Sequence, residues 1–131
     1  MKRGIAIQSY NLPFRKYFID GRDDVILKIL MNCFTALKRV FDKEWENPAN
    51  NVLWKTTGYG AIIKAFPYLH ERGMGRRDLS EKYFYECFNN LKSYMEIKNE
   101  DFSNKFYAGG GEQLQQKLAD YIKEAQYVVY P

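Results

Sequence analysis

The sequence is poor in the residues that build catalytic and metal-binding sites. Among its 131 residues there are one histidine, His70, and two cysteines, Cys33 and Cys87. It contains no Cys-x-x-Cys pair and no Gly-x-Ser-x-Gly nucleophile turn, and no Cys or Asp stands beside His70 at metal-ligand spacing. These absences disfavour an enzyme, so we expect no catalytic residue, no metal site and no cofactor.

Long hydrophobic runs are also missing. The start "MKRGIAIQSYNLPF" is basic, but its apolar run of three or four residues is too short for a signal peptide. No apolar stretch approaches the roughly 18 residues that span a bilayer. Both cysteines lie among apolar neighbours at helical spacing, which is typical of reduced core residues. We therefore expect a cytoplasmic protein that does not bind membranes, and the oligomeric state stays open.

Aromatic and apolar side chains are abundant. The chain holds eleven Tyr, nine Phe and two Trp, and 46% of its residues are apolar. This content is sufficient for one compact domain covering residues 1–131. The formal charge of +4 is a mild basic excess, which favours contact with phosphates or acidic proteins without requiring it.

Four segments show apolar residues at helical spacing and predict a helical core over residues 23–126. Asp23 and Asp24 are expected to cap the first helix, and Asp78 the third. Pro67 predicts a kink or a break in the second helix, because proline removes a backbone donor and clashes with the preceding turn. The four predicted helices cover residues 23–41, about 59–72, 79–95 and 111–126. The predicted fold is an all-α, irregular bundle of about four helices.

Outside these helices the prediction is less regular. Residues 1–22 contain two short apolar segments and are expected to form an extended arm or short strands, with the tail at 127–131 as a candidate partner in a small β-ribbon. The segment "DKEWENPANN" is predicted to be a solvated loop, because Pro48 and three Asn favour turns. Trp45 is expected to pack this loop onto the core. His70 is expected near the end of the second helix, where an imidazole commonly faces the terminal carbonyls.

The segment "KTTGYG" combines a lysine, two hydroxyls and two glycines just before a helix. A Walker motif has its glycines before the lysine, whereas here Lys55 precedes Gly58 and Gly60, which excludes that motif. Two interpretations remain. Either Thr56 or Thr57 caps the helix and the glycines allow close packing against the first helix, or the free amides of the first turn bind an anion with help from Lys55. Capping is needed at every helix, which favours the first.

Two further segments are candidate phosphate sites. Gly109, Gly110 and Gly111 precede the last predicted helix, and consecutive glycines can point several amides at one anion. Glu112 argues against a strong anion site there, and a flexible linker is the alternative. The second segment, "RGMGRR", contains Arg72, Arg76 and Arg77. These guanidinium groups suit a nucleic-acid backbone, and a solvated turn is the alternative.

The order of these features resembles the C-terminal helical region of bacterial DGQHR-domain proteins, which include the DndB-like proteins associated with DNA phosphorothioate modification. The matching features, within about residues 20–122, are an aromatic-rich helix, a Phe-x-x-Glu-Trp loop, the "KTTGYG" turn into a helix, and "AGGG" before a final helix. The Asp-Gly-Gln-His-Arg motif and the ParB-like N-terminal domain that carries it are missing. The resemblance therefore implies a stand-alone or excised module with no inherited catalytic residues, in a setting of bacterial DNA modification, defence or mobile elements.

These observations predict a non-enzymatic helical module. Its expected partner is nucleic acid, bound by the lysine, threonine, glycine and arginine positions named above, or a larger DNA-modification or defence protein. The alternative is a purely structural or protein-interaction domain whose glycines serve packing and capping.

Overall fold

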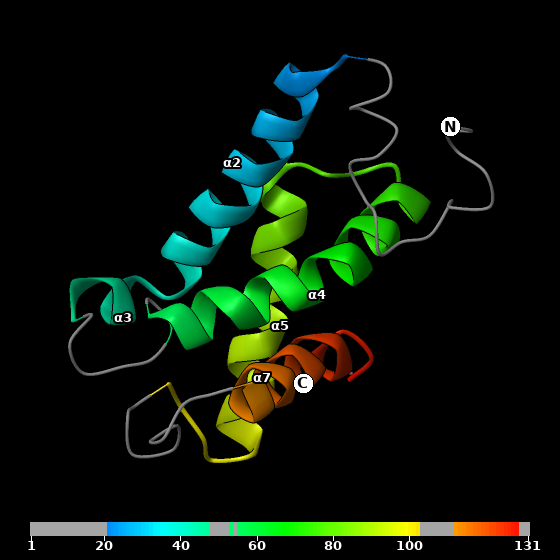
Figure 1. Ribbon diagram of the computed structural model, residues 1–131. Helices are drawn as coiled ribbons and strands as arrows, with labels where there is room; N and C mark the ends of the chain where they lie inside the picture. Colours follow the sequence, from blue (N-terminus) through cyan, green and yellow to red (C-terminus); the bar gives the residue numbers. More distant parts are fainter. Residues whose placement is uncertain (1–20, 48–52, 54, 103–111, 129–131) are drawn as a thin grey trace.

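The computed structural model describes residues 21–47, 53, 55–102 and 112–128. Within them the chain forms helices and no strand, which confirms the predicted all-α bundle. The arm and the tail proposed for a β-ribbon fall almost entirely outside the described residues. The helices, in chain order (Figure 1), are α2 (Asp23–Val40), α3 (Asp42–Glu46), α4 (Thr56–Gly75), α5 (Glu81–Ile97) and α7 (Glu112–Ala125).

Helix α2 forms where its apolar spacing predicts it. Asp23 and Asp24 occupy the first turn and Lys38 and Arg39 the last, an arrangement that complements the helix dipole. The N-cap residue is Arg22, and its Nε lies 3.2 Å from Asp24 Oδ1. This hydrogen bond holds the pKa of Asp24 below its usual value.

The predicted loop after α2 begins instead with the short helix α3. Trp45 in this helix is 43% exposed, so the prediction that it packs onto the core is wrong. Phe41, at the junction of the two helices, is buried there and packs edge-on against Phe102, with ring centroids 4.9 Å apart. The aromatic anchor of this region is therefore Phe41.

Helix α4 continues through Pro67, so the predicted break does not occur. Proline inside a helix costs roughly 3 kcal/mol, because a hydrogen bond is lost and the ring clashes with the preceding turn. The same helix buries Ile62, Phe66 and Leu69 in the core. Each fully buried side chain of this size contributes about 1.5–3 kcal/mol, so the packing of α4 outweighs the effect of Pro67.

The N-cap of helix α5 lies two residues later than predicted. Ser80 is the N-cap, and its hydroxyl accepts a hydrogen bond from the Tyr83 amide at 3.3 Å. Asp78 stands before the cap, where its carboxylate accepts from the Ser80 amide at 3.0 Å. Asp78 therefore supports the cap instead of forming it, and hydrogen bonds from the side chain and the amide of Ser80 hold the pKa of Asp78 below its usual value.

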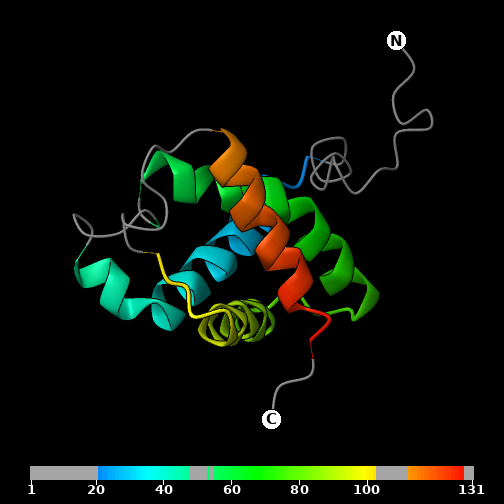
Figure 2. The same cartoon turned by 90° about the horizontal axis from the view of Figure 1, so that it is seen from below.

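The helices pack in two interleaved pairs. Helix α2 packs mainly against α5, helix α4 mainly against α7, and α5 also contacts α7. Figure 2 shows α7 lying across α4, with α5 viewed end-on beside α2. The core lies where the four long helices meet.

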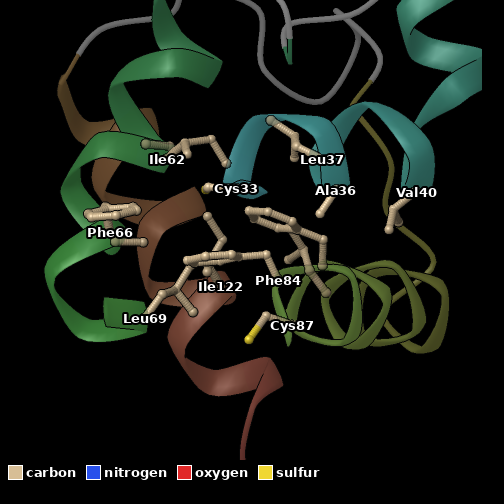
Figure 3. Close-up of a cluster of buried hydrophobic side chains, with 14 of the residues drawn as sticks. Cys33, Ala36, Leu37, Val40, Ile62, Phe66, Leu69, Phe84, Cys87 and Ile122 are labelled. Atoms are coloured by element: carbon tan, nitrogen blue, oxygen red, sulfur yellow. The ribbon is translucent and has the colours of Figure 1, made fainter. Parts of the chain in front are cut away.

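Figure 3 shows this core, with side chains from all four long helices directed toward one another. The rings of Phe66 and Phe84 stack with their centroids 6.1 Å apart. Cys33 and Cys87 are buried free thiols, as predicted, and burial raises the pKa of both. Neither thiol is therefore a reactive nucleophile at neutral pH.

Candidate functional site

The turn after α4, residues 72–78, is a closed helix end. Arg77 has a left-handed backbone with φ of 55°. The Asp78 amide donates to the Gly73 carbonyl at 2.9 Å, and the Arg77 amide to the Met74 carbonyl at 3.1 Å. This pair of bonds is a Schellman motif, which satisfies carbonyls that the helix would otherwise leave unpaired.

Gly73 is required by this turn because nothing larger fits. A β-carbon at this position would lie 2.5 Å from Leu79 Cδ2, 2.8 Å from the Asp78 carbonyl oxygen and 2.9 Å from Tyr83 Cε2. Gly75 is different, since a β-carbon there would meet nothing within 4 Å. One of the two glycines in "GMG" is thus structural.

The three arginines of this turn do not converge on one point. Arg72 is half-buried, with its Nη1 3.9 Å from the Cys87 sulfur on α5. Arg76 Nη1 lies 3.6 Å from Glu86 Oε1, also on α5. Arg77 is exposed in the left-handed position. Two of the three predicted phosphate ligands therefore already interact with the neighbouring helix.

The start of α4 differs from its prediction. The helix begins at Thr56, so Thr56 and Thr57 are already helical and the predicted threonine cap is wrong. The N-cap is Lys55, which is exposed, has extended backbone angles and makes no side-chain capping bond. No side-chain oxygen can cap from a lysine position, so the amides of the first turn have no capping group at this residue.

The glycines at the start of α4 serve packing. Gly58 is buried, and a β-carbon on Gly60 would lie 2.5 Å from the side-chain carbon of Gln115 on α7. The sequence predicted that these glycines pack against the first helix. At Gly60 the close approach is to α7 instead. An ion pair between Lys64 Nζ and Glu112 Oε1, at 3.5 Å, joins the same two helices. The other predicted site, Gly109–Gly111, lies outside the described residues.

The described part of the chain carries no net charge. Of the twenty Lys and Arg, fifteen lie in it, and of the sixteen Asp and Glu, fifteen lie in it. The formal charge of +4 therefore comes entirely from residues 1–20 and 103–111. The helical body itself has no basic excess with which to attract a phosphate backbone.

A site that the sequence did not indicate lies between α2 and α3, and we call it the α2–α3 groove. It consists of two adjoining open pockets that share Thr35, Lys38 and Trp45. The first pocket, of about 430 Å³, is also lined by Met31, Phe34 and Tyr59. The second, of about 520 Å³, is also lined by Arg39, Asp42, Glu46 and Tyr85.

The first pocket is apolar and exposed. Met31 is 56% exposed and Tyr59 is 37% exposed, and the Tyr59 ring lies 6.1 Å from that of Phe34. Leu27, one helical turn before Met31, is 60% exposed on α2. The signal in the sequence was that Leu27 and Met31 are apolar yet fall off the buried stripe of their helix.

The cations of the groove are held by its own side chains. Lys38 Nζ lies 4.6 Å above the Trp45 ring, a cation–π distance. The Arg39 guanidinium lies 4.8 Å from the Tyr85 ring and forms an ion pair with Glu81. Arg39 is thus paired with a carboxylate, whereas the Lys38 ammonium group rests on an aromatic ring.

In the described ranges, no three His, Cys, Asp or Glu side chains are grouped to hold a metal ion. His70 is buried inside α4, which continues to Gly75, so it does not lie at the helix end as predicted. Burial lowers the pKa of His70. In the same ranges, none of the helices combines the length and apolarity needed to cross a bilayer.

Comparison with known proteins adds no relative. No protein-family model matches the chain, and no curated protein or solved structure is significantly similar to it.

Proposed function

We propose that this chain is a non-enzymatic docking module, and that its binding surface is the α2–α3 groove. The observation that carries the proposal is an open apolar pocket, with exposed Met31, Trp45 and Tyr59, on a helical body without net charge. Exposed apolar surface of this kind is typical of protein-interaction sites, because its burial by a partner is favourable. The closed turn at 72–78 and the closely packed Gly60 support the docking proposal, because both candidate phosphate sites have a structural role.

The proposed setting is bacterial DNA modification or defence. The support is the resemblance of residues 20–122 to the C-terminal region of DGQHR-domain proteins. The proposed partner is a larger protein of the same system.

Co-purification tests this proposal. Each protein encoded beside this chain in its genome is co-expressed with it, and complex formation is measured by size-exclusion chromatography. Met31→Asp is expected to abolish the complex, because it places a charge in the apolar pocket. Ile97→Asp is the matched control, since Ile97 is 64% exposed on α5 outside the groove. Equal loss with both variants, or complexes that survive Met31→Asp, would reject the groove as the docking surface.

Nucleic-acid binding is the second candidate, and the position of the net charge favours it. Residues 1–20 contain Lys2, Arg3, Arg15 and Lys16 against the single acid Asp20. Fluorescence anisotropy with labelled duplex DNA, single-stranded DNA and RNA tests this candidate across a salt series. The logarithm of affinity is expected to fall with the logarithm of salt by about 0.9 per duplex phosphate contacted.

Charge variants separate the possible surfaces. Replacing the four cations of residues 1–20 by Gln is expected to weaken binding and flatten the salt dependence. Lys55→Ala or Arg77→Ala is expected to change it far less. If none of the three nucleic acids binds at low salt, the nucleic-acid candidate is wrong.

A further inference from the structure

The α2–α3 groove offers an anchor pocket beside a charged rim. Met31, Phe34, Trp45 and Tyr59 surround the apolar pocket, so a large aliphatic or aromatic side chain can enter among three aromatic rings. Binding energy at interfaces concentrates in such anchors, which are buried in well-packed pockets. The apolar pocket therefore determines how tightly a partner is held, and the rim determines which partner it is.

The side-chain charges of this rim sum to a single negative charge. Arg39 is paired with Glu81, and Lys38 rests on the Trp45 ring and keeps its positive charge, which offsets one of two nearby carboxylates. Asp42 and Glu46 also line the second pocket, four residues apart on α3 and both exposed. No described basic side chain lies within ion-pair distance of either carboxylate.

Asp42 and Glu46 lie on the same face of α3, because residues four apart are neighbours on a helix surface. Like charges in this arrangement repel each other, so a cation placed between them relieves the repulsion. An acidic peptide or a phosphate backbone would add a third negative charge there. The net charge of +4 would favour acidic peptides and phosphate backbones as partners, whereas the two carboxylates of the rim disfavour them.

We propose that the groove binds a cationic segment of a partner protein, with one large apolar side chain in the first pocket and Lys or Arg beside Asp42 and Glu46. This inference rests on the proposed docking function and specifies the chemistry of the occupant. Charges at an interface rim act mainly on specificity and association rate. The preference for a cationic segment therefore falls with increasing salt, whereas the contribution of the apolar anchor persists.

Two synthetic peptides test the preference. Both are twelve-residue amphipathic peptides with the same Trp and Leu anchors, and their polar positions are all Lys in one and all Glu in the other. Affinity for the full chain is measured by isothermal titration calorimetry at low salt. The Lys peptide is expected to bind at least tenfold more tightly than the Glu peptide, and the ratio is expected to shrink at high salt.

Two charge-neutralising variants provide the matched comparison. Asp42→Asn with Glu46→Gln is expected to remove most of the preference. Glu71→Gln with Glu96→Gln removes the same charge from two exposed positions outside the groove and is expected to leave the preference intact. Equal effects of the two double variants, or tighter binding of the Glu peptide, overturn the proposal.

Other occupants give other results. If the Lys peptide binds only after Arg15→Gln and Lys16→Gln, the chain's own N-terminal residues compete for the groove, and the external partner is wrong. If Met31→Asp lowers the mass of the free protein in solution, the occupant is a second copy. If neither peptide binds, the proposed preference for a cationic segment is wrong. The docking function is then decided by the co-purification result.

Discussion

The turn after α4 and the α2–α3 groove differ in how well the sequence predicts their role. The turn was predicted to be a binding site and is packed against α5, whereas the groove was not predicted and is open. The turn contains three arginines and two glycines within six residues, but Arg72 and Arg76 contact α5, and Gly73 is enclosed by α5 and the residues before it. The groove contains no cluster of basic residues and glycines, yet Met31, Trp45 and Tyr59 are left exposed around an open pocket. Arg72, Arg76 and Gly73, which stand out in the sequence, therefore serve the fold. The exposed apolar residues of the groove form the surface that a partner can reach.

The largest expected effect contrasts the two aromatic residues at the α2–α3 junction. Phe41→Ala should lower the free energy of unfolding by about 3 kcal/mol or more, because a buried ring is replaced by a cavity. Trp45→Ala should lower it by only about 1 kcal/mol, since Trp45 is 43% exposed and lies outside the core. Urea denaturation measures both. A loss at Trp45 as large as that at Phe41 would mean that the groove is part of the core.

Gly73→Ala should have the next largest effect. The added methyl group overlaps the Asp78 carbonyl and two side chains, so a loss of about 2 kcal/mol is expected. Gly75→Ala is the matched control, and it should change stability by less than about 1 kcal/mol because the space around Gly75 is open. Similar unfolding midpoints for the two variants would contradict the close packing of the turn.

Arg77→Gly tests the same turn in the opposite direction. The left-handed backbone of Arg77 is unfavourable for any residue with a β-carbon, so glycine should stabilise the protein by about 0.5–1 kcal/mol. Arg76→Gly is the control, since Arg76 has right-handed helical angles. It should be neutral or destabilising. Thermal denaturation of both variants decides whether Arg77 is retained for a reason other than stability.

The smallest expected effect is a pH dependence due to His70. Burial lowers the folded-state pKa of His70 below its ordinary value near 6.5. The unfolded chain therefore takes up a proton first as the pH falls from 7 through 6.5, so the free energy of unfolding decreases and levels off below the folded-state pKa. His70→Met should remove this dependence. Asp24 and Asp78, whose pKa values are also lowered, contribute only at more acidic pH.

The long helices were predictable because their buried residues are local and periodic. The stripe around Leu37 on α2 and that around Phe84 on α5 each lie within one continuous segment. Pro67 predicted a kink or a break, and the break does not occur, because the packing that offsets the local penalty of proline comes from α7 and is not visible in the local sequence. The prediction of a threonine cap was wrong because the helix begins at Thr56, so the cap position falls on Lys55. A shift of one residue at a helix start changes which side chain can cap.

The groove was not predictable, because it depends on how the ends of separate helices meet. Met31, Trp45 and Tyr59 belong to three different helices, and no spacing rule connects them. Only the exposure of Leu27 and Met31 on α2 had a sequence signal. The partners of the arginines were equally hidden, because Glu86 and Cys87 lie on the following helix and become neighbours only when the turn closes.

The interleaved pairing of the helices also affects how the protein is made. Helix α2 packs mainly on α5 and α4 mainly on α7, so the N-terminal half of the chain has no complete pair. During synthesis, Leu37 and Leu69 lack their main partner helices until α5 and α7 have left the ribosome. Until then their apolar faces are open to chaperones or to other nascent chains. Cooperative folding therefore waits for α7, although α2 is made first.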